Sequence, residues 1–413
     1  MKLTDEDQAM LAGDYGPLRQ WAVTHQIQVG RYFHAMDLVP IAQAHIMCDT
    51  ESLGDAGVQW LEHWMDLPAE QRRVKVPTIT DPRGTDFFAA DKLNQARWMV
   101  EREQRTTVAL EACGILMTNT CINYQTIMPP LLGEHVAYGD TGVVIYSNSV
   151  LGARSNFEGG PSAFAAALTG RTPRYGYHLE ARRQPTIHIR STFTPELLDE
   201  WGALGAMVGK LSGDYWSVPL VSGLDRVPTS DEMKHFGAAA ASFGSVALFH
   251  LAGITPDAKL NRDFHDLIPT LPQLNIGRSE FNAFRLQFGR SNRKIDLVVF
   301  SAPQLSIVEM QQLADALDGK RVKIPLLAVT SPQVKPDADR MGLTARIEEA
   351  GGTVLAGMCF YNSYAREMAE ANGWKSLASN SAKLVNIIGG YGYTPTLLSM
   401  EQCIDVACKG GVA

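Results

Sequence analysis

The sequence predicts an α/β protein whose mostly parallel, doubly wound sheets are flanked by helices. Compact runs of β-branched residues alternate with helical segments near the C-terminus, and Gly and Pro residues separate these segments. Several helix starts also carry capping residues. With 413 residues, 45% of them hydrophobic, the chain is long enough to bury a large core.

The clearest strand–helix unit begins at residue 294. The run "KIDLVVFS" (294–301) is typical of a buried strand, and Pro303 follows it. Ser306 and Glu309 have the spacing of a capping box, which predicts the start of the helix "SIVEMQQLADALDG". Ala302 therefore lies at the carboxyl end of a strand, where ligands bind in doubly wound sheets.

Two further strands continue the pattern. "VKIPLLAVT" (322–330) and "GTVLAGMCF" (352–360) are predicted strands, and the segment 337–351 between them is a predicted helix ended by Gly351. Cys359 then also falls at a strand end. We place a domain border before "SNRKIDLVVF", which gives a catalytic region 1–290 and a C-terminal α/β region 291–413 of the same catalytic unit.

Helix starts are also predicted earlier in the chain. Thr229 and Glu232 form a second capping-box pattern before an Ala-rich run. Pro161 suits the first position of the helix "SAFAAAL", which Gly170 ends. Arg154 lies on the loop before this helix, where a helix N-terminus favours an anion. Pairing of Arg154 with Glu158 explains the spacing equally well.

Composition narrows the functional classes. The net charge is −7, and no block of Lys and Arg is interleaved with aromatic residues, which argues against nucleic-acid binding. The start "MKLTDEDQAML" lacks the pattern of a secretory signal. The uncharged run 236–256 is rich in Ala, Gly and Ser, and we expect a tightly packed helix there, with His250 in its packing; a membrane span is the minor alternative. A cytoplasmic protein is expected.

The cysteines show no local framework. They lie at positions 48, 113, 121, 359, 403 and 408, without a CxxC pair. Disulfides are therefore not expected, and a metal site would have to gather ligands from distant segments. Common nucleotide and hydrolase motifs are also incomplete: Leu204 in "GALGAMVGKLS" stands where a phosphate loop requires glycine, and no GxSxG or HExxH occurs.

Several blocks together resemble one family. These are "NSVLGARSNFEGGPSAFAAALTGRTPRYGYHL" (148–179), "FGAAAASFGSVALFHLAGITPDA" (236–258), "NSAK" (380–383), and the weaker "AQAHIMCDTESLGDAG" (42–57), "VPTITDPRGTD" (76–86), "TCINY" (120–124) and "APQLS" (302–306). In order and spacing they are similar to the large subunit of aconitase X, a branch of the aconitase superfamily, over nearly the whole chain.

The resemblance implies an aconitase-like fold and a hydro-lyase that removes water from a small hydroxy acid. Family substrates are cis-3-hydroxy-L-proline, which gives 1-pyrroline-2-carboxylate, and 5-phosphomevalonate. An iron–sulfur cluster or iron ion would act as Lewis acid on the leaving hydroxide. The catalytic base is expected to be a serine on a separate small swivel-domain subunit. We expect cis-3-hydroxy-L-proline as substrate; a metal-depleted paralogue acting as a binding or scaffold subunit and a phosphomevalonate dehydratase are the alternatives.

The metal-ligand positions of the family are only partly retained. They fall on Cys121, Cys359 and position 302, which is alanine here, and Gln304 replaces a family histidine. An alanine methyl group cannot bind iron. Cys113 or Cys48 could supply the missing thiol, or a single iron could be held by fewer ligands or be absent.

The predicted substrate-binding residues come from the same resemblance. Asp140-Thr141-Gly142 stands where the family has Glu-Ser-Ser, Asp81 precedes Pro82 where Asn is common, and Cys48-Asp49-Thr50 replaces a Gly-Val-Ser-like triplet. Acidic residues at 49 and 81 would be poor neighbours for a phosphate.

Other predicted substrate contacts are retained residues. Lys383 is expected to bind a substrate carboxylate, aided by Ser381, although a surface lysine is the commoner role. Asn148 and Arg154 are expected in the same pocket, with Asn148 in a structural turn as the alternative. His45 is either a pocket residue or a hydrogen-bonded core histidine.

Overall fold

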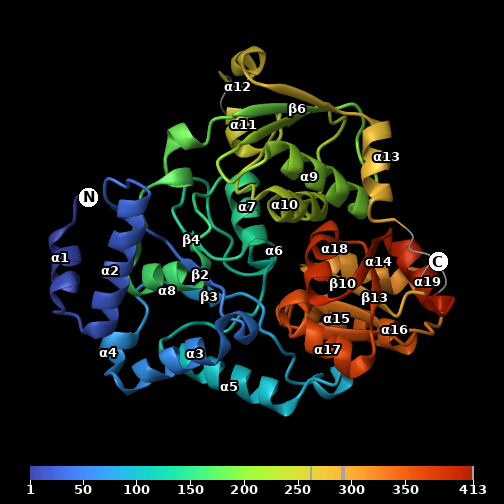
Figure 1. Cartoon of the computed structure of the whole chain (residues 1–413), viewed down its shortest axis with the longest axis horizontal. Helices are drawn as coiled ribbons and strands as arrows, with labels where there is room; N and C mark the ends of the chain where they lie inside the picture. Colours follow the sequence, from blue (N-terminus) through green and yellow to red (C-terminus); the bar gives the residue numbers. More distant parts are fainter. Residues whose placement is uncertain (261–262, 290–293, 412–413) are drawn as a thin grey trace.

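The protein forms a mixed α/β structure, which confirms the predicted fold class. The computed structural model describes residues 1–260, 263–289 and 294–411 (Figure 1). The predicted border between residues 290 and 291 lies outside the described residues and stays a prediction. Within the described ranges, the chain builds three parallel sheets and one antiparallel strand pair.

The N-terminal part of the chain contains a parallel sheet with strand order β3-β2-β4. Its helices are α1 (Asp5–Ala12), α2 (Pro17–Tyr32), α3 (Thr50–His63), α4 (Ala69–Arg72), α5 (Arg97–Ala112), α6 (Asn123–Thr126), α7 (Thr141–Ser149) and α8 (Gly159–Thr169). Its strands are β1 (Leu38–Pro40), β2 (Ala44–Ile46), β3 (Thr78–Thr80), β4 (Ala137–Tyr138) and β5 (Arg171–Pro173).

The middle part forms a second parallel sheet, with order β8-β7-β6-β9. Its elements are β6 (Ile187–Ser191), α9 (Leu198–Ser212), β7 (Pro219–Ser222), α10 (Ser230–Gly244), β8 (His250–Leu251), α11 (Pro256–Leu260), α12 (Asp263–Leu267), β9 (Gln273–Ile276) and α13 (Arg278–Leu286). Helices α9 and α10 approach closely, because a Cβ atom on Gly205 would lie 2.1 Å from the Phe236 carbonyl oxygen.

The C-terminal part is a doubly wound parallel sheet with order β12-β11-β10-β13-β14. Its elements are β10 (Leu297–Leu305), α14 (Ile307–Ala316), β11 (Leu326–Thr330), α15 (Lys335–Arg340), α16 (Leu343–Glu349), β12 (Thr353–Ala356), α17 (Ala365–Asn372), β13 (Ser376–Ser379), α18 (Ala382–Ile388), β14 (Thr394–Leu397) and α19 (Met400–Cys408). Short 3₁₀ turns also occur: η1 (Trp64–Asp66), η2 (Asp91–Leu93), η3 (Gly176–His178), η4 (Glu180–Arg182), η5 (Ile268–Thr270), η6 (Phe360–Asn362) and η7 (Gly389–Tyr391).

Local capping signals are confirmed. Both capping boxes form, with Thr229 opening α10 and Ser306 opening α14. Gly170 ends α8 with a φ of +71°, as expected of a glycine C-cap. This helix starts earlier than predicted, at Gly159, two residues before Pro161.

Three longer-range expectations are corrected. The predicted helix 337–351 is broken into α15 and α16, because Gly342 adopts a φ of +73°. The run 236–256 is helical only to Gly244. A Cβ atom on Gly244 would lie 1.9 Å from the Gly209 carbonyl oxygen, so only glycine fits at this position. The chain then continues into strand β8, which carries His250. β10 continues beyond Ser301 to Leu305, with a register shift after Phe300. No helix in the described ranges is long and apolar enough to cross a membrane.

The middle and C-terminal parts are joined by a buried ion pair between α10 and α14. Lys234 on α10 bonds to the Glu309 carboxylate on α14 and lies 3.0 Å from Asp231, while His235 lies 2.7 Å from the other Glu309 oxygen. Burial alone would raise the pKa of Glu309, but Lys234 and His235 outweigh burial and lower it to about 2. Glu309 is therefore an anion in the folded protein.

Acid should weaken this connection. Because the pKa of Glu309 is lower in the folded than in the unfolded protein, its stabilising contribution is complete above pH 4.5 and is lost as pH falls towards 2. We expect Glu309→Gln to lower the free energy of unfolding by about 3 kcal/mol at pH 7, and to flatten its decline between these two pH values. Denaturant titration at several pH values measures both effects.

The exposed Glu348→Gln on α16 is the matched control and should change neither quantity. An unfolding free energy for Glu309→Gln that declines with acid as steeply as the wild-type value would contradict the assignment.

Candidate active site

Three acidic residues are brought together at one edge of the N-terminal sheet. Asp49 follows strand β2, Asp81 follows β3 and Asp140 follows β4 after one glycine. These strands run parallel, with His45 of β2 paired to Ile79 and Tyr138, so their carboxyl ends lie at the same edge. The structure thus gathers three of the residues that the sequence singled out.

Lys383 lies against this edge from the C-terminal part of the chain. It is in the first turn of α18, and its Nζ atom is 3.3 Å from Oδ2 of Asp140. Both side chains are buried. Burial alone would lower the pKa of Lys383, yet Asp140 outweighs burial and raises it. Asp140 has a lowered pKa because Lys383 and the Val143 N–H outweigh its burial. The pair is therefore ionised.

The first turn of helix α7 lies directly against this ion pair. Thr141 and Gly142 form the first turn of α7, which Asp140 caps by accepting the Val143 N–H at 2.9 Å. A Cβ on Gly142 would lie 3.0 Å from Asp140 Oδ1 and 3.5 Å from Lys383 Nζ. A side chain at position 142 would thus crowd both charges.

Asp81 differs from Asp140 in its charge state. Its Oδ1 atom lies 3.6 Å from His45 Nε2, which instead bonds to the Thr120 carbonyl oxygen at 2.9 Å. No hydrogen bond to this Oδ1 is found within the described residues. Burial, and then repulsion from Asp140, raise the pKa of Asp81 well above its ordinary value. A buried carboxyl group of this kind holds a proton and can donate it.

In the loop after β2, Asp49 and Thr50 make polar contacts, whereas Cys48 has apolar surroundings. Asp49 caps α3, with the Ser52 N–H donating to Oδ1 at 2.8 Å, and burial raises its pKa. Thr50 donates to Glu103 Oε1 at 2.7 Å and lies 2.6 Å from the Tyr364 hydroxyl. Cys48 lines a mostly apolar cavity of about 260 Å³ together with Trp60.

The two candidate metal-binding cysteines sit in separate loops near this edge. Burial, and then the neighbouring Cys359, raise the pKa of Cys121 well above its ordinary value, and burial raises that of Cys359 to about 12. Asp81 and Asp140 raise the pKa of both thiols further. Both thiols are therefore protonated in this environment.

Position 302 is tied to the lysine-bearing helix. Ser381 caps α18 by accepting the Leu384 N–H at 3.1 Å, and its hydroxyl donates to the Ala302 carbonyl oxygen at 2.5 Å. Ala302 itself is fully buried with a φ of +56°. Ser381 thus links strand β10 to the helix that carries Lys383.

The residues present do not fit an iron–sulfur cluster. Such a cluster needs more thiolates than Cys121 and Cys359 supply, and Ala302 offers no ligand atom. Within the part of the chain that the structure describes, no three His, Cys, Asp or Glu side chains are grouped to hold a metal ion. We therefore derive no catalytic step from such a group.

Two predicted substrate contacts make other bonds. Asn148 donates to the carbonyl oxygens of Ser155 and Ala247, and its own oxygen accepts the Ser155 N–H at 2.9 Å, so its amide closes a buried turn. Arg154 pairs with Glu180 at 2.6 Å, and not with Glu158, beside a surface cavity. Pro82, a third predicted substrate contact, follows Asp81 in the segment after strand β3.

Sequence reasoning missed two polar residues of this region. Glu103 is buried and accepts hydrogen bonds from the N–H groups of Thr50 and Gly84. Tyr361 is a partly buried phenol whose ring centre lies 5.5 Å from Lys383 Nζ. Glu103 could have been found, because it occupies the apolar face of α5, in line with Met99 and Leu110.

Comparison with known protein families covers almost the whole chain. The models named Aconitase X first, second and third domain match residues 1–181, 185–285 and 295–409.

Among similar proteins, the phosphomevalonate dehydratase large subunit of Methanocaldococcus jannaschii is 32% identical over 93% of this chain and 94% of its own length. The cis-3-hydroxy-L-proline dehydratase of Pseudomonas aeruginosa is 30% identical over 98% of this chain and 69% of its own length.

A solved structure agrees with these matches. The crystal structure of Thermococcus kodakaraensis aconitase X, described as the holo-form, superimposes with a TM-score of 0.88 at 30% identity, covering 98% of this chain and 100% of that one. The resemblance expected from the sequence blocks is confirmed, and this chain belongs to the aconitase X family, whose named relatives are dehydratases and thus hydro-lyases.

Proposed function

We propose that this chain is the large subunit of a dehydratase that acts on a small hydroxy acid, with cis-3-hydroxy-L-proline as substrate and 1-pyrroline-2-carboxylate as product. The observation that carries the proposal is the charge arrangement at the sheet edge. One buried cation, Lys383, is paired with Asp140, and Asp81 and Asp49 follow the neighbouring strands at the same sheet edge. This arrangement complements a zwitterion with one carboxylate and one ammonium group.

Lys383 would bind the substrate carboxylate. A lysine has three N–H donors, and among the described residues Nζ has one hydrogen-bond partner, Asp140. Removal of the proton from C2 of the substrate places negative charge on the adjoining carboxylate, which the Lys383 ammonium stabilises. Asp140 keeps Lys383 charged, and the first turn of α7, with Thr141 and Gly142, lies beside both.

Asp49 and Asp81 would hold the other polar groups of the substrate. Oδ2 of Asp49 has no hydrogen-bond partner among the described residues, and it suits the ring ammonium. Asp81 is protonated, so it can give its proton to the leaving hydroxyl group, which departs as water. The resulting 2,3-double bond then shifts to the 1-pyrroline form.

The base is proposed to lie on a small partner subunit. The relatives from Methanocaldococcus and Thermococcus are named large subunits, and this chain covers 94% and 100% of them. The resemblance implies that a serine of the small swivel subunit takes the C2 proton.

A second candidate substrate is 5-phosphomevalonate. It is favoured by relatives of 31% and 32% identity that carry this activity in their names. A phosphate at this sheet edge would meet the negative charge of Asp140, which is why we place this substrate second.

Replacing Lys383 with methionine should remove substrate activation while preserving side-chain volume. We expect kcat/KM of the complex with the small subunit to fall by roughly 10²–10³-fold, as for loss of one charge-stabilising donor. Steady-state dehydration assays measure this loss. The exposed Lys375→Met, eight residues earlier, should leave kcat/KM unchanged; an equal loss in both variants would argue against a specific role.

Replacing Asp81 with asparagine tests proton donation. Asparagine keeps the shape of the side chain but cannot release a proton, so we expect kcat to fall by about 10²-fold while KM changes little. A rise in KM with unchanged kcat would instead assign Asp81 to substrate binding alone.

The choice of substrate can be measured directly. We expect kcat/KM for cis-3-hydroxy-L-proline to exceed that for 5-phosphomevalonate by about 10²-fold, because the phosphate meets the buried Asp140 carboxylate. Assay of both compounds with the same large–small complex decides between them. Faster turnover of 5-phosphomevalonate would support the second candidate, and turnover of neither by a folded complex would favour a binding or scaffold subunit.

A further inference from the structure

Gln304 connects the two loops that carry Cys121 and Cys359. Its Nε2 atom donates to the Asn119 carbonyl oxygen at 3.2 Å and to the Met358 carbonyl oxygen at 3.1 Å. Its Oε1 atom accepts the Cys121 N–H at 3.3 Å. Asn119 and Met358 each lie close in sequence to one of the two cysteines, so a single amide group spans both loops.

The backbone of Gln304 adds to this connection. Its N–H donates to the Cys121 sulfur at 3.4 Å, and its carbonyl oxygen accepts from Lys234 Nζ at 3.2 Å. The residue is fully buried. Because both Nε2 protons and Oε1 are used, the side-chain amide is satisfied by the protein alone.

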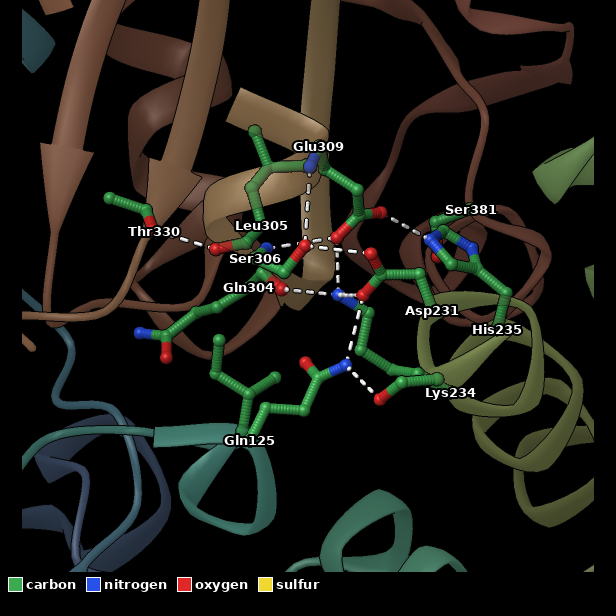
Figure 2. A network of polar contacts seen from close by, with 12 residues as sticks. Gln125, Asp231, Lys234, His235, Gln304, Leu305, Ser306, Glu309, Thr330 and Ser381 are labelled. Carbon is green, nitrogen blue, oxygen red and sulfur yellow. Dashed lines mark hydrogen bonds and ion pairs between the residues drawn. The ribbon is translucent and has the colours of Figure 1, made fainter. Parts of the chain in front are cut away.

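A charged network contacts the backbone carbonyl group of Gln304 through Lys234, as Figure 2 shows. Lys234 bonds to Glu309 and Asp231, and Ser306 donates to Asp231 at 2.8 Å. The adjoining Leu305 carbonyl oxygen accepts from Thr330 at 2.7 Å. Removing one partner from a buried ion pair is costly, so this network fixes the strand end on which Gln304 stands.

We propose that Gln304 is a positioning residue that holds the loops of Cys121 and Cys359 together by hydrogen bonds, in the role that a shared metal would otherwise have. Ala302 leaves the region short of a third thiol, and the loops that carry the two thiols present are joined through Gln304. The loops are therefore ordered without a metal. This inference concerns loop order and does not rest on the identity of the substrate.

Thiol labelling tests the proposal on the full chain. In Gln304→Met the side-chain volume is kept and the three side-chain hydrogen bonds are lost. We expect iodoacetamide to label Cys121 roughly tenfold faster than in wild type, because the loop opens more often. Peptide mass spectrometry reads the rate, with the fully buried Cys403 on α19 as the internal reference.

Gln95→Met is the matched control. Gln95 is also a buried glutamine whose Nε2 donates to two carbonyl oxygens, those of Gly84 and Ser363, but it does not bond to Cys121. It should lower thermal stability comparably and leave the ratio of Cys121 to Cys403 labelling unchanged. If Gln304→Met does not fold, the shorter Gln304→Asn, which cannot reach both loops, takes its place with the same expectation. An unchanged ratio in the Gln304 variant would overturn the proposal.

Iron content provides a second readout. The complex with the small subunit, purified without oxygen from iron-supplied cells, should contain well under one iron per chain, and a chelator should not change Cys121 labelling. Ala302→Cys combined with Gln304→His should increase bound iron and make Cys121 labelling sensitive to chelation. Stoichiometric iron in the wild type, with faster Cys121 labelling after chelation, would show that a metal holds the loops and would refute our inference.

Discussion

The buried ion pair between Lys383 and Asp140 is the interaction on which the candidate site depends. A lysine in a protein interior must either lose its proton or find an anion, and Asp140 is the anion within reach. The two residues are separated by 243 positions, and they follow strands of different sheets, β4 and β13. Their pairing therefore requires that the edge of β4 and the start of α18 lie face to face.

Helix α10 keeps these two elements in place. It packs against α9, α7 and α18, so it contacts the helix that Asp140 caps and the helix that carries Lys383 (Figure 1). The close approach of α9 and α10 is possible because Gly205 and Gly209 have no side chains. Lys234 at the start of α10 then reaches the strand end of β10, which couples the packing of the helices to the position of Gln304.

Local features of this fold could be predicted from sequence, and distant contacts could not. The capping boxes at Thr229 and Ser306 involve residues three positions apart, so their pattern is sufficient evidence. Glu180 as the partner of Arg154, and the carbonyl groups bonded by Gln304, depend on chain segments brought together only by folding. The family resemblance located Lys383 and the acidic residues, but their charge states follow from burial and mutual distance, which the sequence does not contain.

The charge balance at the sheet edge explains why an alanine at position 302 is compatible with an ordered site. If Cys121 and Cys359 were thiolates, they would add two negative charges to a region where Asp140 is already ionised and Lys383 supplies the compensating cation. A metal ion would offset such charges and lower the pKa of the thiols. With two thiols and an unsuitable ligand set, burial and the nearby carboxylates instead favour neutral sulfur and a neutral Asp81. Neutral thiols need no cation to hold them, so hydrogen bonds from Gln304 are sufficient, and a proton on Asp81 can serve the leaving group.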